Sequence, residues 1–214
     1  YTYDVVLNTA KAGYYNYTLP EVSTGDIVVS PLRLVVTVGN LTGDRSVQYG
    51  DAIAPTATAQ LFKGEVELKT EDTRVTSQYS WTTSSSESAG TGVGNYEGVL
   101  TATVTATDNF EVETVAGNLE ITKRMLGIAL NNVTMAYSTG EIAVTYRITS
   151  GSLYGNDEQP VLVNYDITVG GKVADLDRLA VGGYDLNVQG AAFDNPNYGI
   201  ADSVTNGTLT VTPY

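Results

Sequence analysis

Carboxylates in turn-rich segments are the side chains of this 214-residue sequence best suited to chemistry. Asp157 and Glu158 lie in the run Tyr-Gly-Asn-Asp-Glu-Gln-Pro, Asp175 and Asp177 are two positions apart, and Asp51 follows a Tyr-Gly pair. Oxygen donors of this kind are the ligands that Ca²⁺ prefers. Their spacing does not match a regular calcium-binding loop, so the alternative is a set of solvated acids. Calcium is the only cofactor that the sequence suggests.

The single tryptophan, Trp81, is the aromatic residue that most suggests a ligand site. It precedes a Ser- and Thr-rich run that is typical of a loop, and an exposed ring beside a loop could stack on a sugar. Alternation along the strand instead places Trp81 on the same face as Tyr79, toward a core. Host or matrix glycans are therefore a possible ligand class, with core packing as the alternative interpretation.

Four tyrosines recur at matching places along the chain. Tyr49 and Tyr137 are 88 residues apart and begin similar turns, while Tyr96 and Tyr184 each follow a glycine closely. Recurrence favours a structural role over a sugar-stacking series. We expect strand-end tyrosines whose hydroxyls bond to the backbone.

The inventory of side chains argues against an enzyme. The chain has no histidine and no cysteine, which excludes Ser-His-Asp and Cys-His catalysis and most zinc or iron ligation. Two carboxylates across a cleft would suit glycoside hydrolysis, but the acids are spread over strand faces and loops. We expect a non-catalytic protein.

Charge and hydropathy limit the kinds of partner that the chain can have. Eleven Lys and Arg against 24 Asp and Glu give a net charge of −13, which opposes binding to nucleic acid phosphates. No apolar run reaches the length of about 18 residues that a membrane span needs, and no signal peptide is recognisable. An acidic, cysteine-free, Thr- and Tyr-rich chain predicts an extracellular location on a bacterial cell surface.

Self-comparison indicates tandem repeats of about 90 residues. Similar strands begin at Gly25, Gly117 and Gly207, and these glycines lie 92 and 90 residues apart. We interpret the chain as a partial repeat at 1–31, corresponding to the last strands of a preceding unit, followed by complete repeats at 32–123 and 124–214. The junctions between repeats contain no Gly/Ser run, which predicts a stiff rod.

Alternation of apolar and polar residues predicts antiparallel strands within each repeat. Leu100, Ala102, Val104 and Ala106 alternate with threonines, and the run Ile142 to Ile148 alternates in the same way. Turn signals suggest about seven short strands per repeat, and the only predicted helical turn is 173–179. The expected fold is all-β, with tandem Ig-like antiparallel β-sandwich domains, and β-grasp-like repeats are the alternative.

The chain resembles a known family over almost its whole length, most closely over residues 182–213. The run from Gly182 to Val188, the Asn-Tyr pair that ends at Tyr198, and the strand from Gly207 to Pro213 look like the MBG-type repeat of bacterial secreted and surface proteins. The resemblance is weaker over 32–123. It implies tandem Ig-like spacers or binding modules of adhesin-like proteins, without catalytic residues.

These observations predict a non-catalytic extracellular structural or adhesive module, part of a bacterial surface stalk or adhesin. One alternative is a subunit of a filament, pilus or surface layer, in which a neighbouring subunit or another copy of the repeat completes 1–31 by strand complementation. The other is a carbohydrate-binding module centred on Trp81.

Overall fold

The computed structural model describes residues 29–69, 72–201 and 204–214. Its regular structure is almost entirely β-strand, which confirms the predicted all-β class. The first eight strands are β1 (Leu32–Val38), β2 (Val47–Gln48), β3 (Ala57–Lys63), β4 (Val66–Leu68), β5 (Tyr79–Ser85), β6 (Gly94–Ala106), β7 (Phe110–Val115) and β8 (Gly117–Thr122). The others are β9 (Arg124–Leu130), β10 (Val133–Ala136), β11 (Tyr146–Ser150), β12 (Leu162–Val163), β13 (Asp166–Val169), β14 (Lys172–Val173), β15 (Gly182–Gln189), β16 (Ala192–Phe193), β17 (Tyr198–Ile200) and β18 (Gly207–Thr212).

In the residues that the structure describes, helical structure is limited to single turns. These are η1 (Gly43–Arg45), α1 (Thr73–Thr76) and η2 (Leu176–Arg178), and η2 lies inside the predicted helical turn. The turn α1 was not predicted. Among the described residues no helix is long and apolar enough to cross a membrane. Most of the predicted partial repeat 1–31, and with it the idea of strand complementation there, lies outside the described residues.

Strands β1 to β8, which we call unit 1, form two four-stranded sheets with orders β4-β3-β1-β7 and β2-β8-β6-β5. The sheets face each other, because Leu34, Val36 and Leu61 of the first are buried against Ala102 and Val104 of the second. The β-grasp alternative would need a helix across a sheet, and the longest helix in the described ranges has four residues.

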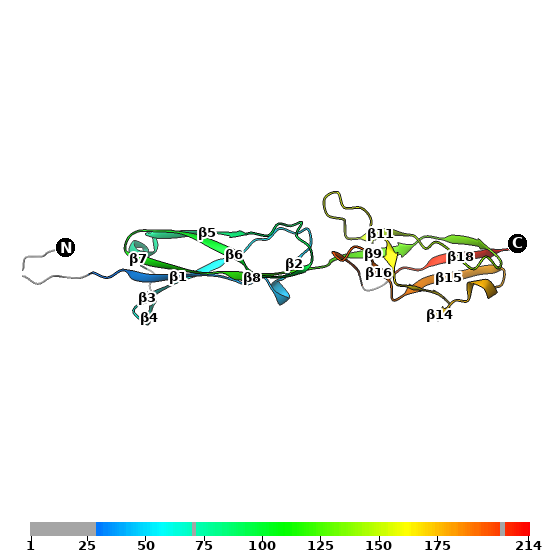
Figure 1. Cartoon of the computed structure of the whole chain (residues 1–214), viewed down its shortest axis with the longest axis horizontal. Coiled ribbons are helices and arrows are strands. Elements are labelled where there is room, and N and C mark those ends of the chain that lie inside the picture. Colours follow the sequence, from blue (N-terminus) through cyan, green and yellow to red (C-terminus); the bar gives the residue numbers. More distant parts are fainter. Residues whose placement is uncertain (1–28, 70–71, 202–203) are drawn as a thin grey trace, which may run out of the picture.

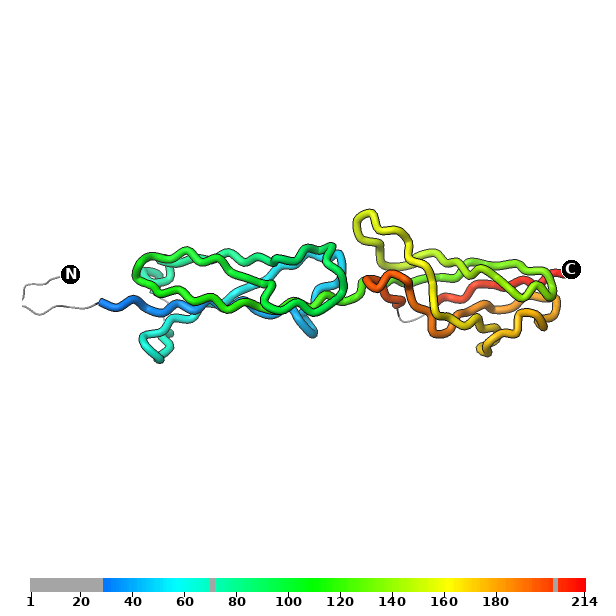
Figure 2. The backbone as a smooth tube through the Cα atoms, in the orientation of Figure 1, coloured from blue at the N-terminus to red at the C-terminus, as the bar shows by residue number. Residues whose placement is uncertain are grey.

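Strands β9 to β18, which we call unit 2, form sheets with orders β10-β18-β15-β13-β14 and β11-β9-β17, plus the two-stranded β12-β16. Leu126, Ile128, Leu186 and Leu209 bring both large sheets into one buried cluster. Figures 1 and 2 show the two units end to end, with the chain passing from β8 directly into β9. In the described part of the chain, no sheet combines strands of both units.

Strand pairing follows the same pattern in both units. In unit 1, β1 pairs antiparallel with β3 and parallel with β7, while β2 pairs parallel with β8. In unit 2, β9 pairs antiparallel with β11 and parallel with β17, while β10 pairs parallel with β18. In each unit the first two strands are therefore parallel neighbours of the last two, one pair in each sheet.

One expected strand is shorter than its alternation suggests. Ile142 and Val144 pack against the core from an irregular segment, and β11 begins only at Tyr146. Its partner β9 ends at Leu130, which lies opposite Tyr146. The residues before Tyr146 therefore lie beyond the end of β9, and β9 cannot continue the strand hydrogen bonds with them.

Two buried glycines allow the first and last strands to approach. A Cβ at Gly117 would lie 2.8 Å from the carbonyl oxygen of Gly39, and a Cβ at Gly207 would lie 2.7 Å from that of Asn131. These obstacles are backbone atoms, which cannot rotate away. Glycine is therefore required at the start of the last strand of each unit, where that strand passes the segment that follows the first strand.

We predict that Gly207→Ala lowers the free energy of unfolding by about 1–3 kcal/mol, because the added methyl forces backbone apart in a packed region. Gly183→Ala is the matched control, since its Cβ would meet nothing within 4 Å. Urea unfolding of both variants measures the difference. Equal stabilities would contradict the assigned role of Gly207.

Candidate functional site

The junction between the units combines hydrogen bonds, an ion pair and ring contacts from side chains of both units. Only Lys123 separates the end of β8 from the start of β9, so the last strand of unit 1 runs straight into the first strand of unit 2. Side chains of both units then close around this connection. We take the junction as the candidate functional site.

Three tyrosine rings pack together at the junction. Tyr49 follows β2 in unit 1, Tyr154 lies in the loop between β11 and β12, and Tyr198 begins β17. The ring of Tyr49 meets those of Tyr154 and Tyr198 edge-on, at centroid distances of 5.4 and 5.7 Å. Tyr49 is 6% exposed and Tyr198 is 1% exposed. Buried edge-to-face pairs of this kind add about 0.5–1.5 kcal/mol each beyond their area.

The carboxylate of Asp157 joins two of these tyrosines across the junction. Its Oδ2 accepts hydrogen bonds from the hydroxyls of Tyr198 at 2.6 Å and Tyr49 at 3.0 Å. The Tyr198 hydroxyl in turn accepts a hydrogen bond from the backbone N–H of Tyr154 at 2.9 Å. One acidic side chain of unit 2 thus holds a tyrosine from each unit.

Burial and this carboxylate change the acidity of both hydroxyls. Burial, and then the hydrogen bond to Asp157, raises the pKa of Tyr198 to about 12. The same two causes raise the pKa of Tyr49 above its ordinary value. Both hydroxyls therefore stay protonated and able to donate at neutral pH.

Arg124, the first residue of β9, bonds to both units. Its guanidinium donates to the Asp51 carboxylate at 2.8 Å and the Tyr49 carbonyl at 3.1 Å in unit 1. In unit 2 it donates to the Ser152 carbonyl at 2.7 Å. The Arg124 side chain is 22% exposed and the Asp51 side chain is 53% exposed, so solvent screens the ion pair in part and the hydrogen bonds to backbone carbonyls add to it.

Local backbone geometry makes room for these contacts. Gly50 has a φ of +88°, and a Cβ there would lie 2.7 Å from the Tyr154 ring. The Asn197 side-chain oxygen accepts from the N–H of Val93, which ties the β5–β6 loop of unit 1 to unit 2 at 3.0 Å. A side chain at position 50 would keep Tyr154 away from the junction.

The calcium candidates do not converge on one place. Asp157 is engaged by the two tyrosines and Glu158 next to it is exposed, while Asp175 pairs with Arg178 beside η2. Asp177 lies near Gly140. Within the described ranges, no group of three or more Asp and Glu side chains could hold a metal ion.

Trp81 is half-buried in a row of aromatic rings on unit 1. It stacks on Tyr79 with an interplanar angle of 14° and a centroid distance of 6.2 Å, and both pack against the buried cluster of Leu34. A hollow of 480 Å³ lies over the pair, lined also by Thr76 and Ser80. Trp81 thus contacts the core, as its alternation with Tyr79 predicted, while its role as a ligand platform stays a prediction.

The recurring tyrosines divide into two kinds. Tyr96 and Tyr184 donate to the carbonyls of the residues four positions earlier, at 2.7 and 2.8 Å, as predicted. Tyr49 differs, because its hydroxyl bonds to a carboxylate of the other unit. Its counterpart Tyr137 is 43% exposed and is followed by Ser138 with a φ of +63°.

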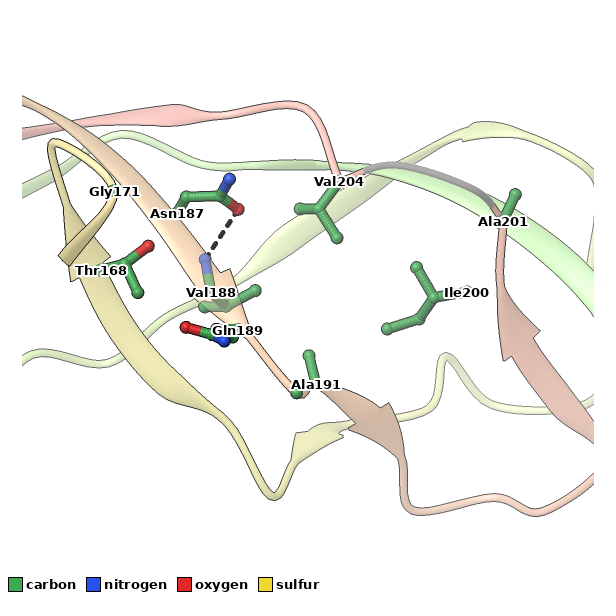
Figure 3. Close-up of a pocket in the computed structure, with 10 residues that line it drawn as sticks. Thr168, Gly171, Asn187, Val188, Gln189, Ala191, Ile200, Ala201 and Val204 are labelled. Carbon is green, nitrogen blue, oxygen red and sulfur yellow. Dashed lines mark hydrogen bonds between the residues drawn. The ribbon is translucent and has the colours of Figure 1, made fainter. Parts of the chain in front are cut away.

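A further hollow of 570 Å³ lies on unit 2, where β15 and the segment after β17 separate (Figure 3). The described side chains that line it are uncharged and include Thr168, Asn187, Gln189 and Ile200. The Asn187 amide oxygen accepts from the N–H of Val188. Among the described residues that line this hollow there is no acidic or basic side chain.

Comparison of the chain with protein-family profiles, with curated proteins and with solved structures finds no significant match.

We predict that alkali weakens the junction through Tyr198. A hydroxyl whose pKa rises on folding stabilises the protein fully below the ordinary tyrosine value of 10.0, and this contribution is lost as pH rises through about 12. Tyr198→Phe should cost about 1.5–3 kcal/mol at pH 7 and flatten the fall in stability above pH 10.

Tyr184→Phe is the matched control, because it also removes a donated hydrogen bond, in this case to the backbone carbonyl of Ala180 and away from Asp157. Denaturant unfolding at several pH values measures all three proteins. Equal alkaline slopes for the two variants would show that Tyr198 is not the responsible group.

Proposed function

We propose that this chain is a non-catalytic extracellular structural or adhesive module, built of two Ig-like β-sandwich repeats at 32–123 and 124–214, within a bacterial surface stalk or adhesin. Its task is to extend a larger protein away from the cell surface and to present other parts of that protein. The observation that carries this proposal is the bonded junction between the units.

A stalk needs units that hold a fixed direction relative to each other. Adjacent domains move by default unless their interface is substantial. Here the one-residue connection is reinforced by the Asp157–tyrosine contacts and by Arg124, which bonds to both units. The matching strand pairing of the units supports two copies of one repeat.

The composition supports the same proposal. A chain without histidine or cysteine is suited to an exterior role that relies on packing rather than on reactive side chains. A net charge of −13 disfavours nonspecific self-association.

We predict that small-angle X-ray scattering of the full chain fits a single extended arrangement of the two units. Arg124→Ala should broaden the distribution of angles between them, because it removes the hydrogen bonds to Tyr49 and Asp51. Arg178→Ala is the matched control, since that arginine pairs only with Asp175 at an exposed site. Wild-type scattering that requires many inter-unit angles would contradict the stalk proposal.

A carbohydrate-binding module is the second candidate function, favoured by the stacked Tyr79–Trp81 pair beside an open hollow. Parallel rings with one accessible side can stack on the apolar face of a sugar. The hydroxyls of Thr76 and Ser80 at the rim could bond to sugar hydroxyls.

We predict that, if this second function is correct, oligosaccharides shift the intrinsic fluorescence of the protein, since Trp81 is its only tryptophan. Trp81→Phe should weaken binding measured by calorimetry, whereas Tyr137→Phe should leave it unchanged as a control at another half-exposed aromatic. A panel of bacterial and host glycans that leaves the fluorescence unchanged would remove this candidate.

A further inference from the structure

The strand by which the chain enters each unit lies parallel to the strand by which it leaves. In unit 1, β1 runs beside β7 over six aligned pairs, from Leu32–Phe110 to Thr37–Val115. The chain then crosses to the other sheet, where Leu41 pairs with Leu119 and β2 pairs with β8, again in parallel. Unit 2 repeats this with β9 beside β17 and β10 beside β18.

This arrangement decides how each unit responds to tension. The chain enters each unit at one pole and leaves it at the opposite pole (Figure 2). A pull along the long axis therefore drags the first and last strands past each other along their lengths. All hydrogen bonds between two such strands stretch together, whereas strands whose pulled ends share a pole separate one pair at a time.

We propose that each unit is a tension-resisting link, in which the parallel first and last strands form a clamp that tension loads in shear. The clamp is β1 and β2 against β7 and β8 in unit 1, and β9 and β10 against β17 and β18 in unit 2. The use of such a link rests on the proposed stalk function, because a surface tether experiences force along its axis.

Hydrogen bonds continue across the place where the chain changes sheets in unit 1. The N–H of Leu41 donates to the Asn118 carbonyl at 2.9 Å, and that of Glu120 donates to the Leu41 carbonyl at 2.8 Å. Beyond β2, the N–H of Tyr49 donates to the Thr122 carbonyl at 2.9 Å. The clamp thus extends from the start of β1 to the junction.

An asparagine side chain closes the crossing in both units. The Asn40 side-chain oxygen accepts from the N–H of Asn118 at 2.8 Å, and that of Asn132 accepts from the N–H of Thr208 at 2.9 Å. Each bond lies next to the glycine, Gly117 or Gly207, that lets the two backbones approach. Both bonds join the first strand region to the last, so axial tension acts on them.

Unit 2 concentrates its clamp in β10 and β18. These strands align over four pairs, from Val133–Leu209 to Ala136–Thr212, and the N–H of Tyr137 donates to the Thr212 carbonyl at 2.8 Å. Strand β17 aligns with β9 over three pairs. Variants near β10 therefore test the proposal most directly.

Single-molecule force spectroscopy tests the clamp by changing only the direction of pulling. The natural chain has no cysteine, so introduced cysteines give unique handles. Axial pulling uses a cysteine added at each end of the chain. Peeling uses Thr139→Cys and a cysteine added after Tyr214, which lie at the ends of β10 and β18 on the same pole. Because four aligned pairs share the axial force, we expect the peeling force to be lower on the order of two- to four-fold.

Neighbouring asparagines provide a matched pair of variants. Asn132→Ala removes a bond between the first and last strands, whereas Asn131→Ala removes a bond from Asn131 to Thr145, which precedes β11. In axial pulling, Asn132→Ala should lower one of the two unfolding force peaks, and Asn131→Ala should lower neither. Thermal unfolding of both variants shows whether their equilibrium losses are comparable.

Equal forces in the two pulling directions, or equal effects of the two asparagine variants on the peaks, would overturn the clamp. Small-angle scattering that shows a hinge at the junction would instead count against the stalk proposal. The unfolding forces measured within each unit would stay the same. The two proposals therefore fail independently.

Discussion

The close parallel approach of the first and last strands in each unit is the constraint on which the rest of the structure depends. It is possible only because Gly117 and Gly207 present no Cβ to the backbone that crosses beside them. Parallel neighbours begin at the same pole, so the leaving strand must end at the pole opposite the entry. Units of this kind line up end to end, and a single residue, Lys123, is enough to connect them.

The junction then combines apolar packing with a few directed bonds. Removing a carboxylate even partly from water is unfavourable unless it is hydrogen-bonded, and the hydroxyls of Tyr49 and Tyr198 meet that need for the half-buried Asp157. The rings remove apolar area from water while their hydroxyls fix direction. Leucines at the same places would bury similar area but would leave the relative rotation of the units less defined.

Local pattern predicted the strands well, because alternation of apolar and polar residues depends only on neighbours in the sequence. The hydroxyl-to-backbone bonds of Tyr96 and Tyr184 were also predictable, since donor and acceptor lie four residues apart. The sequence suggested calcium at Asp157, but its hydrogen-bond partners Tyr49 and Tyr198 lie 108 and 41 residues away. No period or turn signal reports contacts of that kind, and the bonds of Arg124 were missed for the same reason.

The turn after Tyr137 differs from the turn after Tyr49 in one atom that matters. Both turns place the next residue in the left-handed region, but unit 1 has Gly50 there and unit 2 has Ser138. The Tyr154 ring packs directly over Gly50. A ring placed in the same way over Ser138 would collide with its Cβ. The two corners are therefore not interchangeable for a ring packed as Tyr154 is. Each unit in this way limits which loop can lie against its corner, through the presence or absence of one small side chain.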